Sequence, residues 1–165
     1  ITAIATVRNL QLGVKDENIK EGITKIKSVA RLQEIKSGKL KNICKDNRLY
    51  LDGSHNPLGA KALNEYLNTL DCKKHLILGM MSNKDHEEYL SKFNNISSIT
   101  TIDIPNQPNA IKGMDLKEKL NKYPNVSYKK SIEEALDSIN PGKDDLIIIT
   151  GSLSVSYTHL RAHET

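Results

Sequence analysis

A carboxylate and an imidazole three residues apart mark the stretch of this sequence that is best suited to chemistry. Asp52 and His55 stand in the run Asp52-Gly53-Ser54-His55-Asn56-Pro57, directly after the apolar residues 49–51. A brief apolar run bounded by turn residues predicts a short buried strand. The Asn-Pro pair supplies a good helix cap and a suitable first helical residue, so a helix should begin here.

These features together predict a ligand site at the end of a strand. In open α/β sheets, ligands bind in the crevice outside the carboxyl ends of the strands, and Asp52 and His55 would meet there. The start of the following helix adds exposed N–H groups and the positive end of the helix dipole. Both of these suit an anion.

Two further residues have side chains that suit anionic ligands. Ser152 follows Thr150-Gly151 after the apolar run 146–149, where its hydroxyl and nearby N–H groups could hold a carboxylate. Arg31 carries a planar, permanently charged guanidinium that can bind phosphate oxygens bidentately. The alternative for Arg31 is an ordinary surface arginine in a lysine-rich stretch.

Four ordered motifs carry a family resemblance. The run 52–57, followed by Gly59-Ala60, resembles the D-G-[AS]-H-N-P-x-[GA] signature of folylpolyglutamate and dihydrofolate synthases, in the ATP-dependent Mur-ligase superfamily. Three other stretches resemble further segments of that family. The G-R-[LF]-[EQ] segment is matched by Ala30-Arg31-Leu32-Gln33, and the T-G-S-[LF] segment by Thr150-Gly151-Ser152-Leu153. The G-M-x-x-[DN]-K-D segment is matched by Leu78-Gly79-Met80-Met81-Ser82-Asn83-Lys84-Asp85. The likeness is to the family's C-terminal, glutamate-ligase domain.

The resemblance implies roles for the candidate residues. Arg31 and Asp52 would contact ATP, and His55 and Ser152 would hold the incoming glutamate. No residue of this chain is assigned as catalytic or as a metal ligand. The implied cofactors are ATP and Mg²⁺, held mainly by an N-terminal ATPase domain. The implied partners are ATP, L-glutamate, dihydropteroate or folate, and that ATPase domain.

Strand and helix patterns alternate from residue 32 onward. Strands are predicted at 49–52, 75–80, 98–104, 125–128 and 145–150, with helices at 57–70, 85–93, 114–121 and 131–139. Segments 32–35 and 40–44 are predicted to form a small hairpin. This order predicts an α/β fold, with a Rossmann-like, mostly parallel sheet and helices on both faces, which agrees with a Mur-ligase C-terminal domain.

The chain divides into three predicted parts. Residues 1–30 hold two amphipathic helices, over 1–12 and 15–27, and resemble the helical end of the ATPase domain plus a linker. Residues 31–153 form the glutamate-ligase domain. Residues 154–165 depart from the family pattern and resemble a translated adapter sequence, so we expect a non-native tail there. Because the first residue is Ile1, we expect the start to be a cut end.

Composition excludes several classes of protein. Hydrophobic residues at 38% and charged residues at 27% indicate a soluble globular protein, and no apolar run is long enough to cross a membrane. The net charge of +4 comes largely from lysines in 15–48, but no aromatic residues interleave them as nucleic-acid stacking requires. We therefore expect no nucleic-acid partner. Two widely spaced cysteines favour a reducing cytoplasm.

The predicted function is that of one part of a ligase. The resemblance implies an ATP-dependent enzyme of folate biosynthesis that adds L-glutamate to dihydropteroate or folate through an acyl phosphate. The sequence lacks the phosphate-binding pattern G-x-x-x-x-G-K-[ST], so we expect this chain to be inactive alone. Two alternatives stay open. One is a peptidoglycan Mur-type ligase domain, whose signature has an aromatic residue that 52–57 lacks, and the other is a non-catalytic nucleotide-binding or interaction module.

Overall fold

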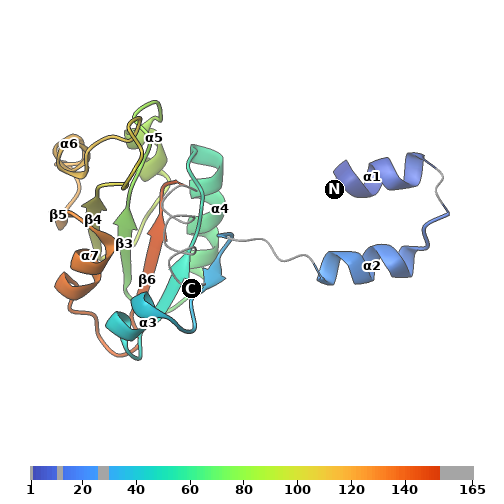
Figure 1. Cartoon of the computed structure of the whole chain (residues 1–165), viewed down its shortest axis with the longest axis horizontal. Helices are drawn as coiled ribbons and strands as arrows, with labels where there is room; N and C mark the ends of the chain where they lie inside the picture. The colour runs from blue at the N-terminus through green and yellow to red at the C-terminus, as the bar shows by residue number, and fades with distance from the viewer. Residues whose placement is uncertain (1, 11–12, 26–29, 153–165) are drawn as a thin grey trace.

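The computed structural model describes residues 2–10, 13–25 and 30–152 (Figure 1). Two helices come first, α1 (Thr2–Asn9) and α2 (Asp16–Thr24). Acidic side chains at Asp16 and Glu17 stabilise the start of α2 through the helix dipole. None of the nine residues of α2 is buried. Both helices lie within the segments predicted to be helical, and their assignment to a separate ATPase domain stays a prediction.

One six-stranded sheet lies at the centre of the part that follows residue 30, within the described residues. Its order is β1-β2-β6-β3-β4-β5, in which β1 is antiparallel to β2 and all other pairs are parallel. The strands are β1 (Gln33–Glu34), β2 (Arg48–Leu51), β3 (Lys74–Leu78), β4 (Ser98–Ile102), β5 (Val126–Lys129) and β6 (Leu146–Thr150). The carboxyl ends of five strands therefore share one edge of the sheet.

Helices cover both faces of the sheet, as Figure 1 shows. On one face lie α4 (Pro57–Asn68), α5 (His86–Ser91) and α6 (Gly113–Lys119). On the other face lie α3 (Lys39–Cys44) and α7 (Ile132–Ser138). The central strands β3 and β6 are buried along their whole length, which explains the apolar runs 76–78 and 146–149 within them.

Alternate side chains of one strand contribute to the two cores. Ile147 and Ile149 of β6 pack toward α3 and α7, whereas Leu146 and Ile148 pack toward the α4 side. This division follows from the two-residue period of side chains along a strand. The predicted fold class and the order of strands and helices from residue 48 onward are confirmed.

The predicted hairpin over 32–35 and 40–44 is wrong. Residues 39–44 form α3, in which Leu40 and Cys44, four positions apart, lie on one helical face and are both buried. The short β1 pairs with β2 instead, with Gln33 opposite Leu51 and Glu34 opposite Tyr50. The free edge of β2 offers β1 a strand that is already held in the sheet, whereas segment 40–44 would have to form a new strand to pair with it.

No helix in the described part of the chain is long and apolar enough to cross a membrane.

Candidate functional site

Three loops meet at the carboxyl edge of the sheet. Because β6 pairs with both β2 and β3, the segments that follow these three strands lie side by side. The Gly151 N–H donates to the Ser54 carbonyl over 3.1 Å, and the Gly79 N–H donates to the Thr150 carbonyl over 3.2 Å. Sequence motifs that lie up to about one hundred residues apart thus form one continuous surface.

Gly151 makes this close approach possible. Its φ of +104° lies in the region that side chains disfavour, and a Cβ atom there would stand 2.5 Å from the Gly79 carbonyl oxygen. Glycine is therefore required on both conformational and steric grounds. The middle position of the T-G-S triplet must therefore be glycine, because the loops after β3 and β6 pack backbone to backbone there.

A buried cluster of three hydroxyls ties the β2 and β6 loops together. The Tyr89 hydroxyl donates to the Ser54 carbonyl over 3.2 Å, and it lies 2.9 Å from Thr150 Oγ1 and 3.0 Å from Ser54 Oγ. The two smaller hydroxyls are 3.2 Å apart. Burial raises the pKa of Tyr89 to about 12, so its phenol keeps the proton that it donates.

Asp52 lies at the end of β2, as predicted, and uses both carboxylate oxygens on the backbone. Oδ1 accepts from the Ser54 N–H and Oδ2 accepts from the Leu32 N–H, each over 2.9 Å. The side chain is buried, with an exposed fraction of 6% for the residue. Asp52 therefore caps its own turn and joins it to the segment that carries Arg31. The predicted ATP contact of Asp52 stays a prediction.

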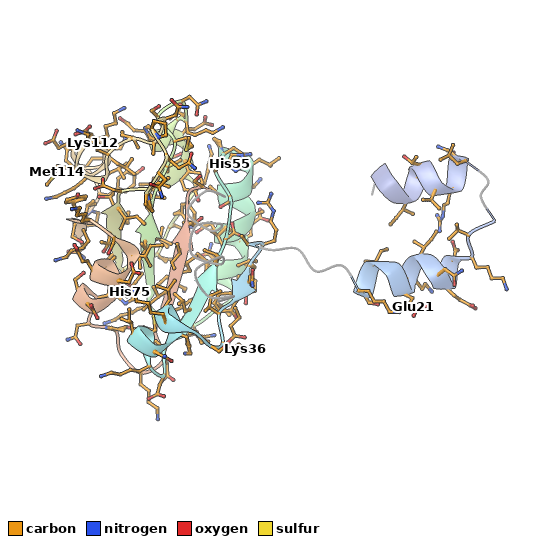
Figure 2. All side chains as sticks on the ribbon, in the orientation of Figure 1. Glu21, Lys36, His55, His75, Lys112 and Met114 are labelled. Carbon is orange, nitrogen blue, oxygen red and sulfur yellow. The ribbon has the colours of Figure 1, made fainter. Side chains whose placement is uncertain are left out.

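His55 lies between the end of β2 and the start of α4. Its Nδ1 is 3.0 Å from the Gly53 carbonyl oxygen. Because a carbonyl only accepts hydrogen bonds, Nδ1 carries the hydrogen and Nε2 has no partner among the described residues. Asn56 caps α4 by accepting from the Gly59 N–H over 2.8 Å, as predicted. Figure 2 shows His55 beside the start of this helix.

Arg31 is exposed at the same edge of the sheet. Since β1 is antiparallel to β2, the residue before β1 lies beside the end of β2. The Ala30 carbonyl accepts from the Gly53 N–H over 2.7 Å, which fixes this segment to the Asp52 loop. The Arg31 guanidinium makes no hydrogen bond or ion pair with any described residue.

The four predicted site residues therefore come together in two pairs. Arg31 is joined to Asp52 through the Leu32 N–H, and His55 is joined to Ser152 through the backbone bond between their neighbours Ser54 and Gly151. Ser152 itself is buried. Sequence reasoning missed Tyr89, because nothing in the sequence links it to residues 35 and 61 positions away.

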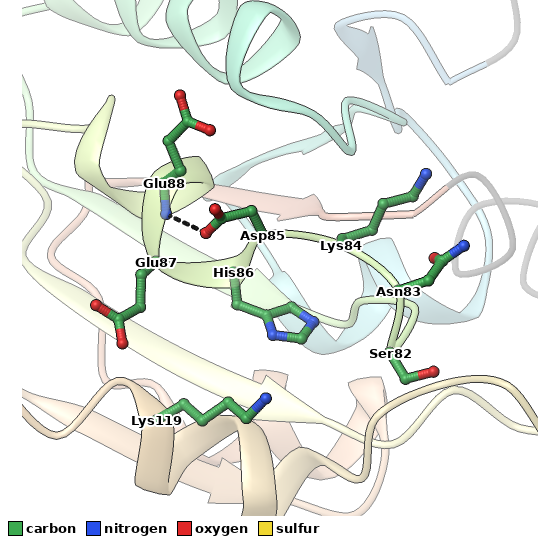
Figure 3. Close-up of a pocket in the computed structure, with 8 residues that line it drawn as sticks. All are labelled: Ser82, Asn83, Lys84, Asp85, His86, Glu87, Glu88 and Lys119. Carbon is green, nitrogen blue, oxygen red and sulfur yellow. Dashed lines mark hydrogen bonds between the residues drawn. The ribbon is translucent and has the colours of Figure 1, made fainter.

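An open pocket of about 830 Å³ lies over the loop that follows β3 (Figure 3). Among its lining residues, Asp85 caps α5, because its Oδ1 accepts from the Glu88 N–H over 2.8 Å. The buried His86 ring bonds the Met81 carbonyl through Nε2 over 3.0 Å. The loop also carries one positively charged side chain, Lys84, which is partly exposed. The lining residues are Ser82, Asn83, Lys84, Asp85, His86, Glu87, Glu88 and Lys119.

The sequence from residue 30 to residue 153 matches the model of one protein family, described as the Mur ligase glutamate ligase domain. This chain belongs to that family. The match covers most of the chain and includes all four motifs, so the family resemblance seen in the sequence is confirmed. A search of curated proteins gives no match.

Solved structures of folylpolyglutamate synthases have the same fold. The bifunctional folylpolyglutamate synthase/dihydrofolate synthase from Yersinia pestis superposes with a TM-score of 0.79 at 23% identity. E. coli FolC in complex with DHPP and ADP gives 0.75 at 21%, and a bifunctional synthase with Mn, AMPPNP and L-glutamate bound gives 0.78 at 22%. Each match covers 98% of this chain but only 37% of the other, so this chain spans little more than a third of these relatives.

Proposed function

We propose that this chain is the glutamate-ligase part of an ATP-dependent ligase that adds L-glutamate to dihydropteroate or folate. The observation that carries the proposal is the meeting of Arg31, Asp52, His55 and Ser152 at one sheet edge, in a chain of the Mur ligase family. Structural relatives that hold ADP, AMPPNP or L-glutamate support the same ligand classes. This enzyme would act in the cytoplasm, in folate biosynthesis.

Arg31 and Asp52 form the ATP half of the proposed site. The Arg31 guanidinium is exposed and offers a planar set of N–H donors that suits phosphate oxygens. Asp52 holds the backbone beside it and could accept a further hydrogen bond from the nucleotide. The main work of phosphoryl transfer is positioning and charge neutralisation, which is the role that Arg31 would perform.

His55 and Ser152 form the glutamate half. With Nδ1 hydrogen-bonded to a carbonyl, His55 presents Nε2 to a ligand. Ser152 follows a glycine turn, where a hydroxyl and backbone N–H groups can bind a carboxylate. We assign these residues to binding and orienting glutamate and assign no general base in this chain.

The proposed reaction has two steps. The γ-phosphoryl group of ATP passes to the carboxylate of dihydropteroate or folate, which gives an acyl phosphate and ADP. The amine of glutamate then attacks the acyl carbon, an amide forms, and inorganic phosphate leaves. Glutamate held by His55 and Ser152 would be oriented for this attack, which lowers its entropic cost.

Metal chemistry is not assigned to this chain. The described residues contain no group of three His, Cys, Asp or Glu side chains that could hold a metal ion. Mg²⁺ and the main phosphate-binding loop would instead belong to an N-terminal ATPase domain, whose last helices are α1 and α2 in this proposal. Residues 31–153 would then be the ligase domain and 154–165, outside the described residues, a non-native tail.

Comparing the 165-residue chain with the full-length protein that contains it tests this function. We expect the full-length protein to incorporate labelled L-glutamate into dihydropteroate or folate only with ATP present, and the chain alone to give no product. D-Glutamate is the matched control. Product formation by the chain alone would contradict the two-domain site, and activity only on a peptidoglycan precursor would favour the Mur-type alternative.

A further inference from the structure

The turn that carries Arg31 has an unusual backbone. Ala30 and Leu32, on either side of Arg31, have φ values of +54° and +47°. Positive φ is uncommon outside glycine, asparagine and aspartate, and it is costly for a bulky residue such as leucine. Such backbone persists only where the surrounding structure enforces it.

Three hydrogen bonds enforce this turn. The Ala30 carbonyl accepts from the Gly53 N–H over 2.7 Å, and the Leu32 N–H donates to Asp52 Oδ2 over 2.9 Å. The third comes from within the turn, where the Ala30 N–H donates to Gln33 Oε1 over 3.0 Å. Ala30 is fully buried, so its N–H depends on this side-chain acceptor rather than on solvent.

Gln33 is well placed to act as this acceptor. It is the first residue of β1, and its register opposite Leu51 fixes its backbone to the sheet. Its side chain therefore reaches back from a fixed strand to the residue that precedes Arg31. The Arg31 guanidinium has no other anchor among the described residues, so the backbone of residues 30–32 alone fixes the point from which its side chain extends.

We propose that Gln33 is a positioning residue for Arg31, acting by holding the Ala30 N–H and with it the strained turn. This inference rests on the proposed ATP role of Arg31. Gln33 does not touch the nucleotide. Its carboxamide oxygen fixes the backbone from which the Arg31 side chain departs, so that the turn need not be ordered when ATP binds.

The test uses steady-state kinetics of the full-length protein with ATP and glutamate varied separately. Gln33→Met keeps the length of the side chain and removes the acceptor, whereas Gln33→Glu keeps an acceptor oxygen. We expect Gln33→Met to raise the KM for ATP about 2–10-fold, with the KM for glutamate unchanged. Gln33→Glu should stay close to the parent, and Gln107→Ala serves as a matched control at a glutamine outside the turn.

A double variant separates positioning from general stability. If Gln33 acts through Arg31, adding Gln33→Met to Arg31→Ala should cause no further rise in the KM for ATP. An unchanged KM in Gln33→Met, while Arg31→Ala raises it, overturns the positioning role alone. An unchanged KM in Arg31→Ala overturns the ATP role of Arg31 and this inference with it. An equal additional loss in the double variant shows that Gln33 only stabilises the fold.

Discussion

Both edges of the parallel sheet hold buried polar side chains, but the two edges differ in whether the polar groups around them have hydrogen-bond partners. At the amino edge, Asn47 donates to the carbonyls of residues 142, 143 and 145, at 2.6, 3.4 and 3.3 Å. His75 lies between Ser98 Oγ and Asp145 Oδ2, at 2.8 and 3.2 Å. Each of these groups finds its partner inside the domain. Figure 2 shows His55 and His75 toward opposite edges.

At the carboxyl edge the polar groups brace the backbone and leave other groups open. Asp52 and Tyr89 hold three loops in place, yet the Arg31 guanidinium and His55 Nε2 have no partner among the described residues. Buried polar groups therefore do not by themselves mark a function. What marks the carboxyl edge is that braced loops present unpaired charge and hydrogen-bonding capacity to solvent.

The comparison between the edges predicts its largest effect for two arginines, one at each edge. In the full-length protein, Arg31→Ala should lower kcat/KM for ATP roughly 10–100-fold, because a charged hydrogen bond to phosphate contributes about 1.5–3 kcal/mol. Arg31→Lys should restore only part of the loss. Arg48→Ala is the matched control at the amino edge, where Arg48 Nη2 contacts Cys72 Sγ and the Asp144 carbonyl, both at 3.4 Å. Equal losses in ATP kinetics for Arg31→Ala and Arg48→Ala would contradict the distinction.

Asn47 should show the opposite behaviour to Arg31. Asn47→Ala removes a buried donor from three carbonyls of an otherwise exposed turn, so we expect the free energy of unfolding to fall by about 1–3 kcal/mol. The KM values for ATP and glutamate should not change. Urea unfolding of the 165-residue chain measures the first, with the exposed Asn121→Ala as control. A stability change no larger than that of Asn121→Ala would show that the amino-edge network is dispensable.

Variants of His55 and Ser152 test the glutamate half that we propose at the carboxyl edge. His55→Ala in the full-length protein should raise the KM for glutamate about 10-fold, or ~1.4 kcal/mol, and leave the KM for ATP nearly unchanged. Ser152→Ala should shift the same parameter less, because a neutral hydrogen bond contributes less than a charge-assisted one. A collapse of kcat at saturating glutamate with an unchanged KM would instead make His55 a catalytic base.

The smallest effect is a pH dependence at the amino edge. Burial acts to raise the pKa of Asp145, but the Gly142 N–H and His75 outweigh it, and the pKa is lowered from its usual 3.8. A lowered pKa gives stability that is present above 3.8 and is lost as the pH falls through the lowered value. Urea unfolding between about pH 5 and pH 2 should therefore show a decline that Asp145→Asn flattens. The same decline in Asp145→Asn would assign it to other groups.

Much of the fold was predictable because its signals are local. The helix cap at Asn56 predicts the start of α4, and short apolar runs predict β3 and β6, each from a few neighbouring residues. Helix α3 was missed because only Leu40 and Cys44 mark its buried face. The placement of candidate site residues at strand ends was also predictable, since parallel strands share an edge.

The connections between the site residues were not predictable in the same way. The Leu32 bond to Asp52 spans 20 positions, and the hydroxyl contact of Ser54 with Thr150 spans 96. Such pairs depend on which strands become neighbours in the sheet, and no local sequence pattern predicts the strand order. The proposed role of Gln33 likewise rests on the positive φ of Ala30 and on the hydrogen bond to its N–H, neither of which the sequence reveals.

The position of β6 also bears on how the chain folds during synthesis. This strand lies between β2 and β3 and is the last strand of the described chain to be translated. Until residues 146–150 leave the ribosome, β2 and β3 each lack their central partner and expose apolar strand edges. A nascent chain that stops short of residue 146 would therefore hold two unjoined part-sheets, β1-β2 and β3-β4-β5, and would be a ready substrate for chaperones.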